Sequence, residues 1–208
     1  MKPFLLFDFD GTIANSIGLI YDILNRLAPR FGLEPVSIED FEVLRSMSPP
    51  TLLRMAGIPF YKIPLVIHLV LKEYRKQVHE LHPYPGIEEM LSALDRTGVR
   101  TALLSSNTKR NVTDFLARHH ITGFEWVEGT SGVMNKRGRI NRMIRKHKLD
   151  PGNVIYIGDE SRDIEAAKQC GIRVISVTWG FHAESLLNRY KPDYIVQNPA
   201  EIVDLIKN

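Results

Sequence analysis

Two aspartates separated by one residue, Asp8 and Asp10, follow the apolar run 4–7 near the start of the chain. Residues two apart in an extended chain point the same way, about 6 to 7 Å apart, so both carboxylates can act at one site. One acid can attack an electrophile while the other moves protons. Gly11 permits a sharp turn, and the N–H groups after it suit an anion. An acidic surface turn is the alternative, but two acids that repel each other after a buried strand favour a functional site.

A second polar group, Ser105 and Ser106, follows the apolar run 101–104. A hydroxyl here could donate to a phosphoryl oxygen, together with neighbouring backbone N–H groups. The same residues are also an ordinary sequence for the start of a helix. The residue types alone therefore leave both interpretations open.

A third polar group, Asp159 and Asp163, follows the apolar run 154–157. Both acids would also be favourable at the start of a helix, and the two interpretations are compatible. Gly180 and His182 lie after a further apolar run and could border the same pocket. We interpret these two residues first as part of a turn.

The apolar runs that precede these polar groups are typical of strands buried on both faces of a parallel sheet. Helix-like stretches with apolar residues at helical spacing separate the later runs. Strands that alternate with helices predict an α/β fold, a doubly wound parallel sheet with a Rossmann-like core. Such sheets bind ligands at the carboxyl ends of their strands. The strands are expected at residues 4–7, 101–104, 154–157 and 173–177.

The segment 15–82 interrupts this alternation, because it contains no convincing strand. It predicts a helical insert with helices at 17–31, at 38–46, after Pro49-Pro50 and at 63–81. The chain would thus consist of a discontinuous core, residues 1–14 and 83–208, and an inserted helical domain, residues 15–82. The apolar run 63–71 is interpreted as packing within that insert rather than as a partner-binding face, and the oligomeric state is left open.

Composition excludes several classes of protein. Of the 208 residues, 44% are hydrophobic and 25% are charged, which is a globular balance. The longest stretch without Asp, Glu, Lys or Arg is 11–21, far shorter than the roughly 20 apolar residues that span a bilayer. The single cysteine, Cys170, permits no internal disulfide. We therefore expect a cytoplasmic protein with no membrane contact.

The net charge of +3 comes from one segment, 136–148, which holds seven basic residues and no acidic one. The rest of the chain has 20 basic and 24 acidic residues, so it is slightly acidic. Nucleic-acid-binding segments usually have aromatic residues among their basic ones, and this segment has none. A solvated helix face is favoured, and a nucleic-acid partner is not expected.

The motif Asp8-x-Asp10-Gly11-Thr12 resembles the first motif of the haloacid dehalogenase superfamily, which includes phosphatases with an aspartate nucleophile. Its second motif corresponds to Ser105, with the Ser106 amide beside it, and its fourth to Asp159 and Asp163. The third motif is a lysine, for which Lys136 is the first candidate and Lys109 the second. The helical insert resembles the cap that many members carry after the first motif, and the chain is most similar to the phosphoglycolate phosphatase branch.

This resemblance implies hydrolysis of a small phosphorylated metabolite in two steps. Asp8 would attack phosphorus to form an aspartyl-phosphate, and Asp10 would protonate the leaving oxygen and then activate water. Mg²⁺ would be held by the side chains of Asp8 and Asp159 and by the backbone carbonyl of Asp10. Asp163 would hold a metal-bound water or a second oxygen position. Ser105, Ser106 and Lys136 would bind the phosphoryl group.

Other functions would use part of the same sequence pattern. A phosphomutase would share all four motifs, whereas a haloacid dehalogenase would not need Asp10 to transfer a proton. A signalling receiver domain needs a shorter chain and carries its phosphorylated aspartate on a middle strand. The non-enzymatic alternative is a nucleic-acid-binding or protein-binding module that uses the segment 136–148.

Overall fold

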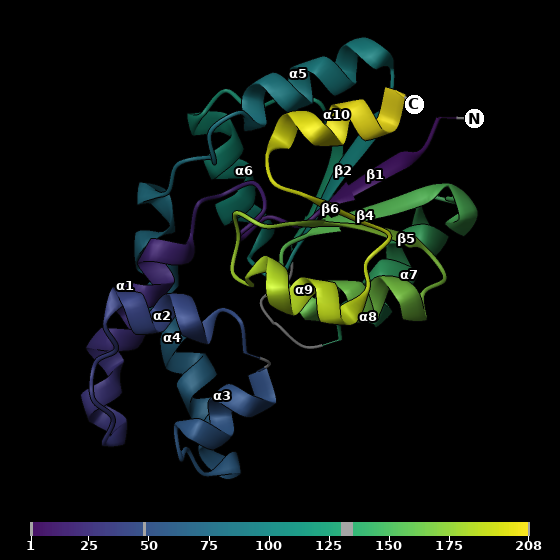
Figure 1. The fold of residues 1–208 in the computed structure, drawn as a ribbon. Helices are drawn as coiled ribbons and strands as arrows, with labels where there is room; N and C mark the ends of the chain where they lie inside the picture. Colours follow the sequence, from purple (N-terminus) through teal and green to yellow (C-terminus); the bar gives the residue numbers. More distant parts are fainter. Residues whose placement is uncertain (1, 48, 130–134, 208) are drawn as a thin grey trace.

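The computed structural model describes residues 2–47, 49–129 and 135–207 (Figure 1). Within them, six strands form one sheet, in the order β3-β2-β1-β4-β5-β6, and every neighbouring pair is parallel. The strands are β1 (Phe4–Phe7), β2 (Arg100–Ser105), β3 (Phe124–Gly129), β4 (Val154–Gly158), β5 (Arg173–Val177) and β6 (Tyr194–Val196). The predicted doubly wound parallel α/β fold is confirmed.

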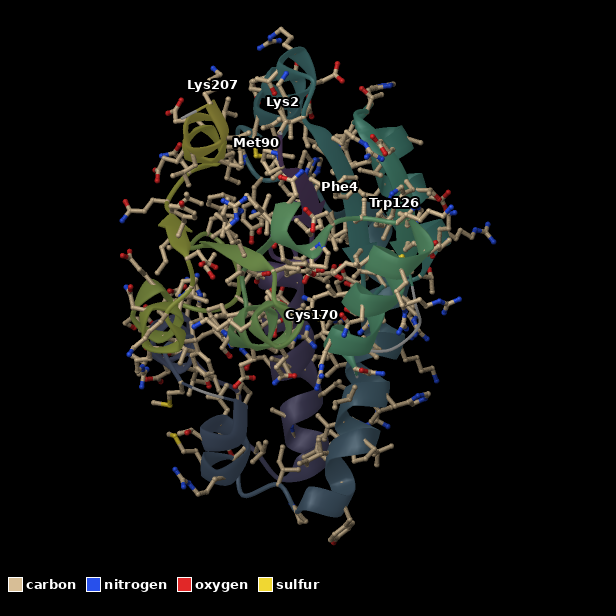
Figure 2. All side chains as sticks on the ribbon, turned by 90° about the vertical axis from the view of Figure 1, so that its right-hand side faces the viewer. Lys2, Phe4, Met90, Trp126, Cys170 and Lys207 are labelled. Carbon is tan, nitrogen blue, oxygen red and sulfur yellow. The ribbon has the colours of Figure 1, made fainter. Side chains whose placement is uncertain are left out.

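Helices cover both faces of this sheet (Figure 1). One face carries α5 (Ile87–Thr97), α6 (Lys109–Arg118) and α10 (Pro199–Lys207), and the other carries α7 (Lys136–Lys146), α8 (Ser161–Gln169) and α9 (Glu184–Tyr190). Each layer closes an apolar cluster against the sheet. On the second face Phe4 of β1 stacks on Trp126 of β3, with ring centroids 5.9 Å apart (Figure 2). Burial on both faces explains why the inner strands are continuous apolar runs.

Residues 15–82, which we call the helical segment, lie to one side of these layers (Figure 1). They contain α1 (Ile17–Leu27), α2 (Ile38–Leu44), α3 (Pro49–Met55) and α4 (Ile63–Gln77), and no strand occurs among their described residues. Its two ends run side by side, because the Asn15 N–H donates to the His82 carbonyl at 2.9 Å and the Tyr84 N–H to the Ile13 carbonyl at 3.0 Å. The chain thus enters and leaves the helical segment at one place.

The apolar run at the start of α4 is only partly covered. α4 packs against α1, and Leu69 and Val70 contact the larger apolar cluster. Between residues 63 and 71, however, no side chain is fully buried, and Leu65 is 50% exposed. No helix in the described part of the chain combines the length and apolar character needed to cross a membrane.

Candidate active site

The end of β1 positions Asp8. The backbone N–H of Asp8 still donates to the Ile157 carbonyl of β4, at 2.8 Å, and the Phe9 N–H donates to Asp8 Oδ1, also at 2.8 Å. The chain then turns at Gly11, which has a φ of +75°. A Cβ at Gly11 would overlap the carboxylate of Asp159, so the turn needs glycine for both its conformation and its space.

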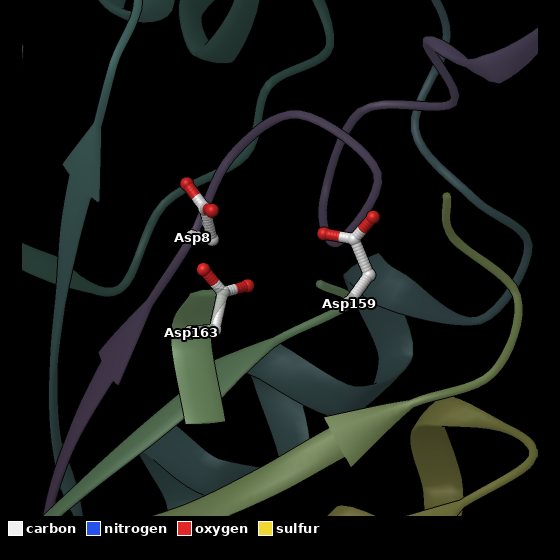
Figure 3. A group of neighbouring side chains, drawn as sticks. All are labelled: Asp8, Asp159 and Asp163. Carbon is white, nitrogen blue, oxygen red and sulfur yellow. The ribbon is translucent and has the colours of Figure 1, made fainter. Parts of the chain in front are cut away.

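Three carboxylates meet at this edge of the sheet, those of Asp8, Asp159 and Asp163 (Figure 3). Oxygen atoms from all three lie within 4.8 Å of one another, and the residues are only 4%, 0% and 0% exposed. Asp159 directly follows β4, the neighbour of β1, and Asp163 lies in the first turn of α8. The sheet order reverses between β1 and β4, which is where open α/β sheets bind ligands.

Hydrogen bonds fix the orientation of the two later acids. The Thr12 hydroxyl donates to Asp159 Oδ1 at 3.1 Å, and the Phe181 N–H donates to Asp159 Oδ2 at 2.7 Å. Asp163 Oδ2 accepts the Glu160 N–H at 3.1 Å, as part of a capping box at the start of α8. Asp163 therefore serves the helix start and the acidic cluster together, as the sequence allowed.

Lys136, at the start of α7, brings a positive charge to the cluster. Its Nζ contacts Asp8 Oδ2 and Asp163 Oδ1, and it lies 5.0 Å from the centre of the Tyr156 ring. The alternative lysine, Lys109, is exposed at the start of α6, where its charge acts on Glu128. Of the two candidates, the structure brings Lys136 to the predicted nucleophile.

Burial shapes the charges of this cluster. It raises the pKa of Asp8 although Lys136 opposes the shift, and it raises the pKa of Asp159 well above the usual value, with Glu160 and Asp163 adding to the effect. Burial alone would lower the pKa of Lys136, but the carboxylates of Asp163 and Asp8 raise it well above its ordinary value. Even with Lys136 in place, the cluster is short of positive charge. A set of hard oxygen ligands of this kind suits a divalent cation.

Asp10 lies beside this cluster and keeps some exposure to solvent. Burial raises its pKa to about 7, although a hydrogen bond from Tyr74 opposes the shift. The Tyr74 hydroxyl, from α4 of the helical segment, donates to Asp10 Oδ1. A carboxyl group with a pKa near neutrality can both give and take a proton under ordinary conditions.

Ser105 and Ser106 lie at the carboxyl end of β2, next to β1. Ser105 is fully buried, and its hydroxyl accepts the Asn107 N–H at 2.8 Å. The helix that follows is capped by Thr108, whose hydroxyl accepts the Asn111 N–H at 3.2 Å. Neither serine is the residue that caps α6, so the helix-start interpretation does not explain them.

Gly180 and His182 support Asp159 from the loop after β5. A Cβ at Gly180 would overlap Asp159 and the Gly11 carbonyl. The His182 N–H donates to the Asp159 carbonyl at 3.3 Å, and its Nδ1 accepts the Ser161 N–H at 2.9 Å. Burial lowers the pKa of His182, which favours the neutral ring that this acceptor role requires. Both residues lie in a loop, which agrees with their first interpretation as part of a turn, and they also border the acidic cluster.

Known proteins of similar sequence and structure include hydrolases. The sequence model of the haloacid dehalogenase-like hydrolase family matches residues 5–177. The chain is 30% identical over 203 residues to phosphoglycolate phosphatase of Synechococcus elongatus, covering 97% of this chain and 96% of that protein. It is 26% identical over 218 residues to phosphoglycolate phosphatase of Vibrio cholerae, with 97% and 96% covered. A haloacid dehalogenase-like hydrolase structure from Streptococcus pneumoniae has a TM-score of 0.77 at 23% identity and covers 98% of both chains.

The parallel α/β fold, with a buried acidic cluster at its switch point, agrees with a hydrolase of this class. The chain belongs to the haloacid dehalogenase-like hydrolase family. The sequence-based predictions of this family and of a phosphatase are confirmed.

Proposed function

We propose that the protein hydrolyses a small phosphomonoester with Asp8 as nucleophile and Mg²⁺ as cofactor, and that phosphoglycolate is its substrate. The observation that carries the proposal is the placement of Asp8 in one buried cluster with Asp159, Asp163 and the Lys136 ammonium group. The names of the relatives in Synechococcus elongatus and Vibrio cholerae support phosphoglycolate as the substrate.

The acidic cluster fits Mg²⁺, which prefers six oxygen ligands and keeps several waters. Carboxylate oxygens of Asp8 and Asp159 and the backbone carbonyl of Asp10 would hold the ion, and Asp163 would bind one of its waters. When bound, Mg²⁺ neutralises the charge of the phosphoryl oxygens and of the surrounding acids. Burial and the neighbouring carboxylates raise the pKa values of Asp8 and Asp159, and a bound cation would oppose this shift.

The reaction divides between two carboxyl groups. Asp8 attacks phosphorus, the bond from phosphorus to the leaving oxygen breaks, and Asp10 gives its proton to that oxygen. Asp10 then takes a proton from the water that attacks phosphorus of the aspartyl-phosphate, the bond from phosphorus to the Asp8 oxygen breaks, and phosphate leaves. Both carboxyl groups thus return to their starting state. The charge that spreads over the phosphoryl oxygens would be stabilised by Lys136, the Ser105 hydroxyl and the Ser106 amide.

We further propose that the helical segment is a cap domain over a core of residues 1–14 and 83–208. It enters and leaves the sheet region at one place, and Arg45 and Tyr74 reach from it to the loops around the acids. A cap of this kind excludes water from the reaction and supplies contacts to the substrate. The lone cysteine is consistent with a reducing compartment, and we place the reaction in the cytoplasm.

The substitution Asp8→Asn tests the nucleophile, because it keeps the shape of the side chain and removes its nucleophilic carboxylate. Phosphate release from phosphoglycolate should fall at least about 10³-fold, as expected when a nucleophile is lost. Removing Mg²⁺ with a chelator should stop the wild type and be reversed by added Mg²⁺. The exposed Asp114→Asn is the matched control and should keep wild-type turnover.

The outcomes separate the parts of this proposal. Retained turnover in Asp8→Asn would contradict the nucleophile assignment. A panel of sugar phosphates and nucleotides tests the substrate, because a tenfold higher kcat/KM for another ester would replace phosphoglycolate and leave the hydrolase intact. Phosphoryl transfer between sugar phosphates without phosphate release would show a mutase instead.

A further inference from the structure

Tyr74 is the one residue of α4 that the structure buries fully among those it describes, with 4% of its surface exposed. Its ring belongs to the apolar cluster that also contains Phe9 and Ile13, on either side of the turn that carries Asp10. Its hydroxyl donates to Asp10 Oδ1. Packing therefore fixes the ring, and the ring fixes where the hydroxyl meets the carboxylate.

The surroundings of the hydroxyl keep it a donor. Burial raises the pKa of Tyr74 well above its ordinary value, and the charge of Asp10 adds to the shift. The side chains of Asn107 and Ser16 lie close enough to oppose this shift. Asn107 follows the end of β2, and Ser16 accepts the Gly11 N–H at 3.1 Å. The Tyr74 hydroxyl thus lies where the helical segment meets the ends of two strands.

We propose that Tyr74 is a positioning residue for Asp10, and that its hydrogen bond to Oδ1 leaves the other carboxylate oxygen to exchange protons with the substrate. This inference rests on the proposed function, in which Asp10 is the general acid. An unrestrained carboxyl group spends only part of its time in a productive orientation, and a fixed donor on one oxygen removes that loss. The Tyr74 proton itself is not transferred; the proton that moves belongs to Asp10 in the first step and to water in the second.

Tyr84 provides a matched control. It is also buried, at 7% exposed, and its charge environment includes Asp159 and Asp10. Its hydroxyl has no hydrogen-bond partner among the residues that the structure describes. Tyr84→Phe therefore removes a buried hydroxyl beside the site without removing a bond to Asp10.

The leaving group distinguishes positioning of an acid from a general structural effect. Dinitrophenolate leaves without protonation, whereas phenolate and the alkoxide of phosphoglycolate need a proton. In Tyr74→Phe, kcat/KM should fall about tenfold or more for phenyl phosphate and phosphoglycolate, and less than about threefold for dinitrophenyl phosphate. The expected loss is only part of what a general acid contributes, because Asp10 itself is still present. Tyr84→Phe should stay within about twofold of wild type for all three esters. An equal loss across the esters, or a loss no larger than that of Tyr84→Phe, would overturn the inference.

A double-mutant cycle gives a second test. If Tyr74 acts through Asp10, adding Tyr74→Phe to Asp10→Asn should cause less than about a twofold further loss in phosphoglycolate turnover, whereas independent residues would give multiplied losses. Multiplied losses would overturn the positioning role while leaving the proposed function in place. Absence of hydrolysis of all three esters by the wild type with Mg²⁺ would overturn the proposed function and this inference together.

Discussion

The sheet edge and the helical segment differ in what they bury: the first buries charged groups, and the second encloses a mostly apolar space. At the sheet edge Asp8, Asp159 and Asp163 are buried and held by backbone N–H groups, a threonine hydroxyl and Lys136. The helical segment instead surrounds a largely apolar cavity of about 470 Å³, lined by side chains of α1 to α4 and reaching Phe181 and His182. In the proposed reaction, the first region carries the chemistry of the phosphate, and the second borders the space beside it.

This difference determines how each region responds to substitution. Buried charges are costly when a partner is removed, because the remaining charge stays buried and unpaired. Apolar surfaces of a helical segment are more tolerant, and several are already exposed, such as Met55 at 61% and Val43 at 55%. Substitutions at the sheet edge should therefore act on turnover, and those in the helical segment should act mainly where it touches the site.

Among the substitutions that compare these two regions, the largest effect is expected at Lys136. Lys136→Met keeps the length of the side chain but leaves Asp8 and Asp163 without the ammonium group between them. Removing one stabilising charge or donor from a site of this kind costs about 10² to 10³ in kcat. Lys109→Met is the matched control, because Lys109 is exposed and its charge acts on Glu128 rather than on the acidic cluster.

The measurement is phosphate release at saturating Mg²⁺, with circular dichroism to establish that both variants fold. A small loss in Lys136→Met together with a large loss in Lys109→Met would assign the phosphate-binding role to Lys109 instead of Lys136. Equal small losses would remove the lysine from the proposed mechanism altogether.

Much of this site could be predicted because its acids follow strands with strong apolar patterns. Burial on both faces makes β1 and β4 continuous apolar runs, and the next acids must then lie at the carboxyl edge of the sheet. The outer strands β3 and β6 escaped prediction for the complementary reason. β3 is only partly buried and reads Phe-Glu-Trp-Val-Glu-Gly, and β6 has three residues.

Contacts between distant segments could not be predicted in the same way. Tyr74 is separated from Asp10 by 64 positions, and no motif marks it. Arg45 is 135 positions from Gly180, whose carbonyl it contacts. Both contacts depend on how the helical segment packs on the sheet region. The apolar periodicity of a helix predicts which of its faces is buried, but it does not predict which distant residue that face will contact.

An intermediate effect is expected at Arg45, which connects the two regions. Its guanidinium donates to the carbonyls of Gly180 at 2.5 Å and Phe181 at 3.1 Å, and the N–H of Phe181 in turn holds Asp159 at 2.7 Å. Arg45→Met should lower kcat/KM about tenfold, in line with the loss of hydrogen bonds from a charged group, and should raise the Mg²⁺ concentration needed for half-maximal activity.

Arg54→Met, an exposed arginine of the same segment, is the control and should leave both quantities unchanged. If Arg45→Met also left both unchanged, the two regions would be independent, and the loop between them would not transmit the contact to Asp159.

The smallest effect is expected on the outer face of α7, whose first residue is Lys136. Lys146 pairs with Glu128 with its side chain 51% exposed, and Arg142 and Arg145 are exposed as well. Exposed ion pairs contribute little to stability, about 0 to 1 kcal/mol. Replacing Arg142, Arg145 and Lys146 together with Gln should change phosphate release less than about twofold, because only the first turn of this helix reaches the acids. A collapse of turnover would extend the site along the basic face of α7, and the positive segment would then take part in the chemistry beyond Lys136.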